Sequence, residues 1–222
     1  MTNLKIFSFA RGTILMLDNK GFDLWADGYD ASVNLSEESN EYPFAGYKNV
    51  LNIIYNAVRT KEKAAVLDIG FGTGTLTKKL YDDGYSIYGI DFSERMVQIA
   101  REKMPSAELF QYNFSKGLPE ELDNIRFDYI ISTYAIHHLE DEEKVKFLNK
   151  LTNYLLDNGE ILIGDIAFET RGLLERCRIN SIDDWDSEEI YIVFNDLKDI
   201  FPEERISFLQ VSHCAGIISL KK

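Results

Sequence analysis

Two carboxylates separated by three glycines are the residues of this chain whose types and spacing could do chemistry. Asp68 ends one apolar run, Asp91 ends the next, and between them lie Gly70, Gly72 and Gly74. Glycine permits a tight turn and lets the backbone approach a ligand without a Cβ in the way. A helix expected after Gly74 would point its first N–H groups at that ligand. Asp91 is then placed to accept hydrogen bonds from both hydroxyls of a ribose.

The glycine spacing indicates which nucleotide is bound. Dinucleotide-binding loops use G-x-G-x-x-G, but Thr75 stands where the third glycine would be, and the glycine comes one residue early. This difference disfavours a nicotinamide dehydrogenase. Asp68 would also repel a pyrophosphate, whereas it suits an ammonium group, directly or through water. We therefore predict a nucleoside with a cationic amino-acid tail, namely S-adenosylmethionine, which would leave as S-adenosylhomocysteine.

Further motifs support a resemblance to a known class of enzyme. They are FDLWADGYD at 22–30, the loop at 66–75, YGID at 88–91, FDYIISTYAIHHL at 127–139 and Asn158-Gly159. In these motifs the chain resembles the class I S-adenosylmethionine-dependent methyltransferases, and most of all their small, largely uncharacterised bacterial members (YrrT-like). The resemblance covers residues 20–166 well and 167–205 poorly.

The alternation of short apolar runs and helical segments predicts an α/β fold. Strands are expected at 65–69, 86–91, 107–111, 127–132, 159–166, 205–211 and 214–220, and helices at 74–84, 93–104 and 141–156. Such alternation implies parallel strands joined by crossovers. We expect a doubly wound, mostly parallel, seven-stranded sheet with a C-terminal antiparallel hairpin, as the resemblance also implies.

The chain is expected to form one methyltransferase domain over residues 21–222. Residues 1–20 are interpreted either as a flexible extension or as a segment ahead of a true start at Met16. Residues 21–60 are expected to be a helical N-terminal cover, because apolar residues between Phe44 and Val58 recur at helical spacing. Residues 167–204, with a helical stretch near 187–200, are expected to be an insertion that covers the substrate at the carboxyl ends of the strands.

The resemblance implies a set of cofactor-binding residues. They are Tyr29, Asp68, Gly70, Gly72, Gly74, Asp91, Phe92, Met96, Asn113 and Ser132. Asn113 stands where the family often has an aspartate that accepts the adenine amino group, and an amide oxygen can still accept that hydrogen bond. Structural alternatives stay open: an N-cap for Asp91, although Ser93 is the better cap, core packing for Met96, a turn for Asn113 and an aromatic staple for Tyr29.

One residue is a candidate for acid–base chemistry. His137 follows the fourth predicted strand and could take a proton from an acceptor hydroxyl; the alternative is that it packs or hydrogen-bonds a carbonyl. Methyl transfer from a sulfonium needs alignment in a dry pocket more than it needs a base. No metal ligands are predicted. The segment Ser132-Thr133-Tyr134 lacks the motifs of enzymes that methylate DNA or protein glutamine, so we expect a small-molecule acceptor.

Composition limits the partners. The 222 residues carry a formal net charge of −13, which disfavours nucleic acid and an anionic membrane surface. No apolar run approaches the ~20 residues of a membrane span. Two distant cysteines read as reduced thiols of a cytoplasmic protein. A monomer or a homodimer is expected. The functional alternative is a non-catalytic module that binds the cofactor or its product.

Overall fold

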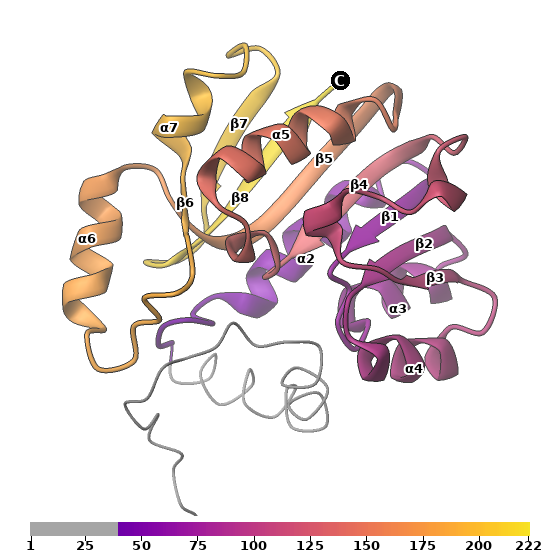
Figure 1. Cartoon of the computed structure of the whole chain (residues 1–222), viewed down its shortest axis with the longest axis horizontal. Coiled ribbons are helices and arrows are strands. Elements are labelled where there is room, and N and C mark those ends of the chain that lie inside the picture. Colours follow the sequence, from indigo (N-terminus) through magenta and orange to yellow (C-terminus); the bar gives the residue numbers. More distant parts are fainter. Residues whose placement is uncertain (1–39) are drawn as a thin grey trace, which may run out of the picture.

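This computed structural model describes residues 40–222, which form a sheet with helices on both faces (Figure 1). Tyr29, the predicted extension 1–20 and residues 21–39 of the predicted cover 21–60 lie outside the described residues. The strands are β1 (Ala65–Ile69), β2 (Ser86–Asp91), β3 (Glu108–Gln111), β4 (Phe127–Thr133), β5 (Leu155–Phe168), β6 (Ile192–Val193), β7 (Ile206–Gln210) and β8 (Ala215–Lys221). The α-helices are α2 (Tyr47–Val58), α3 (Thr75–Asp82), α4 (Glu94–Lys103), α5 (Asp141–Thr152), α6 (Arg171–Asn180) and α7 (Phe194–Lys198).

The sheet has the order β3-β2-β1-β4-β5-β8-β7. Neighbours from β3 to β5 are parallel, whereas β8 runs antiparallel to both β5 and β7. The doubly wound fold and its antiparallel C-terminal hairpin are therefore confirmed. The chain reverses its direction of winding between β1 and β4, and ligands of such sheets bind at the carboxyl ends of the strands at this reversal.

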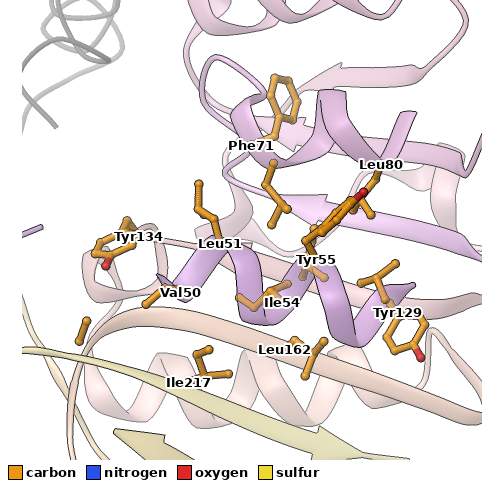
Figure 2. Packing of buried hydrophobic residues seen from close by; sticks show 14 of the residues in the cluster. Val50, Leu51, Ile54, Tyr55, Phe71, Leu80, Tyr129, Tyr134, Leu162 and Ile217 are labelled. Atoms are coloured by element: carbon orange, nitrogen blue, oxygen red, sulfur yellow. The ribbon is translucent and has the colours of Figure 1, made fainter. Parts of the chain in front are cut away.

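Two apolar layers hold the helices against the sheet. One contains buried residues of α2, α3 and α4, and the other contains those of α5 and α7. In the first layer, Val50 and Ile54 of α2 face Leu162 of β5 and Ile217 of β8 (Figure 2). The predicted helix ending at Val58 is α2, and its buried residues fall on one stripe.

Three details differ from the sequence-based prediction. An eighth strand, β6, pairs with the end of β5 over only two residues, too short to produce a periodic signal. The helix predicted to reach residue 156 ends at Thr152, because Leu155 already pairs with Phe127 before an irregularity in the register. The helix predicted near 187–200 is only α7, while α6 was missed because it buries a single side chain, Cys177.

None of the helices within residues 40–222 is long and apolar enough to cross a lipid bilayer. Cys177 and Cys214 are both buried free thiols.

Candidate active site

The glycine loop turns the chain from β1 into α3 with three left-handed residues. The φ angles of Gly70, Gly72 and Gly74 are 70°, 56° and 78°, a region in which a side chain is strained. A Cβ at Gly70 would lie 2.5 Å from the Cβ of Ala135, so this glycine also permits close packing of the loop on the chain after β4. At Gly72 nothing lies within 4 Å of that position. Gly72 is therefore the glycine at which the backbone is open to a ligand.

Asp91 at the end of β2 is hydrogen-bonded to the glycine loop. Its carboxylate is 4% exposed and accepts hydrogen bonds from the backbone N–H of Gly72 at 2.8 Å and from that of Ser93 at 2.9 Å. The cap of α4 is Ser93, whose Oγ accepts from Met96 N at 3.1 Å. Asp91 is thus not needed as the cap, and the sequence-based preference for Ser93 is confirmed.

Asp68 in β1 is a buried carboxylate with an unsatisfied oxygen. It is 1% exposed, Thr77 donates a hydrogen bond to Oδ2, and Oδ1 has no partner among the described residues. Burial and the nearby charge of Asp91 raise the pKa of Asp68 to about 7, against the lowering effect of the Thr77 hydrogen bond. A buried acceptor without a donor is costly, so this oxygen suits the cationic tail of the expected cofactor.

Three further predicted residues have structural partners. Ser132, at the end of β4, donates from Oγ to the carbonyl of Ile69 at 2.8 Å and so ties β4 to β1. Asn113 is exposed, and its Oδ1 accepts from Ser115 N at 2.9 Å, which is the predicted turn alternative. Met96 is buried in the first turn of α4. The register places Asp68, Asp91 and Ser132 at the carboxyl ends of three adjacent strands.

His137 lies between two carboxylates. Its Nδ1 is 2.6 Å from Asp165 Oδ1, and its Nε2 is 3.4 Å from Glu189 Oε1. Burial alone would lower the pKa of His137, but these two carboxylates raise it to about 10. The positive ring in turn lowers the pKa of Glu189 to about 2 against the effect of burial. With its pKa raised to about 10, the ring of His137 carries a proton on both nitrogens at neutral pH. It therefore has no lone pair with which to take a proton from a methyl acceptor.

Asp165, Glu189 and Tyr134 were not singled out from the sequence. Asp165 is fully buried, and besides His137 Nδ1 it accepts the backbone N–H groups of Ile136, His137 and Ile166. A carboxylate inside the apolar run of β5 was the signal available for it. Tyr134, directly after β4, has a left-handed φ of 52°, and strained backbone of this kind concentrates at functional sites. Glu189 lies in the weakly patterned segment before β6 and gave no signal.

A shallow hollow of about 230 Å³ lies between α2 and α3, lined by Leu51, Tyr55, Thr75, Leu76 and neighbouring polar residues. It contains neither Asp68 nor Asp91, so we do not assign the cofactor to it.

Comparisons with known proteins agree with this fold. The family described as "Methyltransferase domain" matches residues 66–159. Magnesium protoporphyrin IX methyltransferase from Synechocystis, solved with bound S-adenosylhomocysteine, has a similar fold, with a TM-score of 0.69 at 20% identity over 93% of this chain and 96% of that one. The chain belongs to the class I S-adenosylmethionine-dependent methyltransferases.

Two similar proteins come from bacteria. An uncharacterized methyltransferase of Alkaliphilus oremlandii is 35% identical over 86% of this chain and 89% of its own length. A second, from Geobacillus, is 40% identical over 70% of each chain. These relatives favour an enzyme over the non-catalytic alternative. The finer YrrT-like resemblance stays a prediction.

Proposed function

We propose that this enzyme binds S-adenosylmethionine across the carboxyl ends of β1 and β2 and transfers its methyl group to a small molecule held at the ends of β4 and β5. The observation that carries the proposal is the Asp91 carboxylate, fixed by Gly72 N at 2.8 Å beside the orphaned Oδ1 of Asp68. An acid placed for a ribose and a second acid placed for a cation match the two ends of one ligand.

The cofactor-facing residues have separate roles in this proposal. Asp91 accepts the ribose hydroxyls, because a carboxylate oxygen can accept more than one hydrogen bond. Asp68 orients the methionine end, and Gly72 lets the backbone approach. Gly70 and Gly74 shape the turn. The fit of these residues to the cofactor is supported by the open space beside Gly72 and by the unsatisfied oxygen of Asp68.

The adenine end is assigned to the remaining candidates. Met96 and Phe92 flank the ring, and Asn113 accepts from its amino group with the oxygen that also accepts Ser115 N. Ser132 keeps the end of β4 against β1 through its bond to the Ile69 carbonyl. Tyr29 would approach from the predicted cover 21–60, in the stretch 21–39 that is outside the described part of the chain.

The acceptor side is supported by the segment ahead of β6. Ile190 N donates to the carbonyl of His137 at 3.0 Å, and Tyr191 Oη donates to Glu189 at 2.8 Å. Trp185 stacks on Tyr42 with ring centroids 5.1 Å apart. This part of the predicted cover at 167–204 therefore lies against the chain that leaves β4. The segment is rich in aromatic and acidic side chains, which suits a small neutral or cationic acceptor.

The bound cofactor supplies an activated methyl group whose leaving group is a neutral thioether. The chain's own task is to align the acceptor and exclude water. A catalytic base at His137 stays a prediction. Since both of its ring nitrogens face carboxylates, we propose that His137 orders the acceptor side and does not accept the proton itself.

Calorimetry on the full chain tests the cofactor assignment. We expect S-adenosylmethionine and S-adenosylhomocysteine each to bind one site per chain with micromolar dissociation constants. Absence of binding by either at millimolar concentration would reject the proposal. The acceptor can then be sought by following S-adenosylhomocysteine release with sets of small amines, alcohols, thiols and carboxylic acids.

The negative charge and free cysteines support a cytoplasmic enzyme that acts on neither nucleic acid nor membranes.

A further inference from the structure

Two histidines and a glutamate meet at the carboxyl ends of β4 and β5. One ligand-type atom from each of His137, His138 and Glu189 lies within 4.8 Å of the others. The histidines belong to the turn Ile136–His138 that follows β4, and Glu189 comes from the segment before β6. Residues far apart in sequence thus place two imidazoles and one carboxylate together, a ligand set typical of zinc sites that keep an open position.

Hydrogen bonds from neighbouring side chains orient the His137 and Glu189 ligand atoms, as they do in metal sites. Asp165 is bound to Nδ1 of His137 at 2.6 Å, which directs Nε2 toward Glu189. Metal-binding histidines almost always have such a carboxylate or carbonyl on the other ring nitrogen. Glu189 is oriented as well, because Tyr191 Oη donates to its Oε2 at 2.8 Å and leaves Oε1 on the histidine side.

We propose that Nε2 of His137, a ring nitrogen of His138 and Oε1 of Glu189 form a site for a divalent transition-metal ion, with Zn²⁺ as the expected occupant. Imidazole and carboxylate ligands suit Zn²⁺, which takes nitrogen and oxygen at about 2.0–2.2 Å. Two such ligands can be at most about 4.4 Å apart, so closure requires only small side-chain movements. The ion replaces the Nε2 proton of the ion pair, and that proton leaves to solvent.

The position is accessible to an ion. His137 is buried and the Glu189 side chain is 23% exposed, but His138 is exposed at the surface. Three protein ligands leave one coordination position for a water molecule or a ligand oxygen. If the proposed function is correct, this position faces the acceptor side, and the ion would select acceptors that carry a hydroxyl, carboxylate or similar oxygen donor.

Calorimetric titration of the chelator-treated full chain with Zn²⁺ alone tests the site. We expect one equivalent to bind with a micromolar or lower dissociation constant. His138→Ala and Glu189→Gln should each weaken binding at least tenfold. The matched controls are His213→Ala and Glu188→Gln, which change the exposed third histidine and the exposed neighbour of Glu189. Both should bind as the unchanged chain does.

Absorption with Co²⁺ in place of Zn²⁺ separates the ligand types. Nitrogen and oxygen ligands should give visible bands without a near-ultraviolet thiolate band, and the visible bands should be weaker in Glu189→Gln at the same Co²⁺ concentration. Millimolar or weaker Zn²⁺ binding, equal loss in His213→Ala, or a thiolate band from Cys177 or Cys214 would overturn the proposal. S-adenosylhomocysteine titrated into the same samples shows whether the cofactor site is intact, so failure of the metal site is distinguishable from failure of the proposed function.

Discussion

Asp91 and Asp128 are both buried carboxylates that accept backbone N–H groups, yet they lie at opposite ends of the parallel strands. Asp91 ends β2 beside the glycine loop, whereas Asp128 is the second residue of β4, where it accepts from Ala65 N and pairs with Lys61. We expect Asp91→Asn to weaken S-adenosylhomocysteine binding by about tenfold to a hundredfold, since a charge-assisted hydrogen bond contributes roughly 1.5–3 kcal/mol. Asp128→Asn should lower the melting temperature and leave the calorimetric Kd unchanged. Equal Kd values in the two variants would contradict the ribose assignment.

The raised pKa of Asp68 predicts a pH dependence of stability. Its pKa rises from the usual 3.8 to about 7 in the folded chain, so between these values the folded state binds more protons than the unfolded state. The free energy of unfolding therefore falls as pH rises through this window. From pH 5 to pH 8 the contribution of this one group falls by about 2–3 kcal/mol.

Denaturant unfolding of the unchanged chain and of Asp68→Asn at both pH values measures this effect. As pH rises from 5 to 8, the free energy of unfolding of the variant should increase by about 2–3 kcal/mol relative to that of the unchanged chain. A pH-independent difference would show that Asp68 ionises normally. Because a cation would favour the carboxylate form, S-adenosylmethionine binding should also release a proton at pH 6 and strengthen toward pH 8.

Among single residues, those whose role depends on local spacing can be predicted from the sequence. Asp68, the glycines and Asp91 follow one another around a single strand–helix–strand unit, so their meeting needs no knowledge of distant segments. The cluster of His137, Asp165 and Glu189 is different, because three separate segments supply it. The sequence singled out His137, but nothing in it showed that Asp165 and Glu189 are the partners of this histidine.

Among the helices and strands, α2 packs closely against β5 at Gly164. A Cβ at Gly164 would lie 2.2 Å from Val50 Cγ1 and 2.9 Å from Ile54 Cδ1. Gly164→Ala should therefore push α2 from the sheet and lower the free energy of unfolding by about 1–3 kcal/mol, the usual cost of overpacking. Val50→Ala in the same chain should restore part of this loss, so the double variant is more stable than the sum of the single changes by about 1 kcal/mol.

Gly172→Ala is the control for this prediction. It lies in α6, where a Cβ would meet only Thr170 Oγ1 at 3.8 Å, so it should be neutral or stabilise by up to about 1 kcal/mol. Strictly additive effects of Gly164→Ala and Val50→Ala in urea unfolding would show that the two residues do not meet as described.

Element boundaries were predictable where apolar periodicity is strong. Strands β1, β2 and β4 and the hairpin of β7 and β8 carry apolar runs bounded by polar turns, and the structure has them within a residue or two of the predicted bounds. Helix α6 buries only Cys177, so its pattern gave no signal. The early start of β5 depends on pairing of Leu155 with Phe127, a tertiary contact that overrides the helical pattern before it.

Over the whole molecule acidic residues outnumber basic ones, 37 to 24, and the proposed cofactor site contains two of these acids, Asp68 and Asp91. The formal net charge is −13, and a field of this sign attracts a cation and concentrates it near the site. S-adenosylmethionine carries one net positive charge at neutral pH, whereas S-adenosylhomocysteine carries none and is otherwise nearly the same ligand. The pair therefore separates the electrostatic part of binding from the rest.

We expect salt to weaken binding of the charged ligand more than that of the neutral one. Raising NaCl from 0.05 to 0.5 M shortens the screening length to well below the ~10 Å of 0.1 M salt. The Kd of S-adenosylmethionine should then rise by about threefold, which corresponds to roughly 0.6 kcal/mol, while that of S-adenosylhomocysteine changes by less than half as much. Calorimetry at four salt concentrations gives both slopes. The Asp68→Asn variant should leave the difference between the two slopes nearly unchanged, because salt screens a buried charge much less than surface charges. Equal slopes for the two ligands in the unchanged chain would show that the field of the acidic surface does not reach the site.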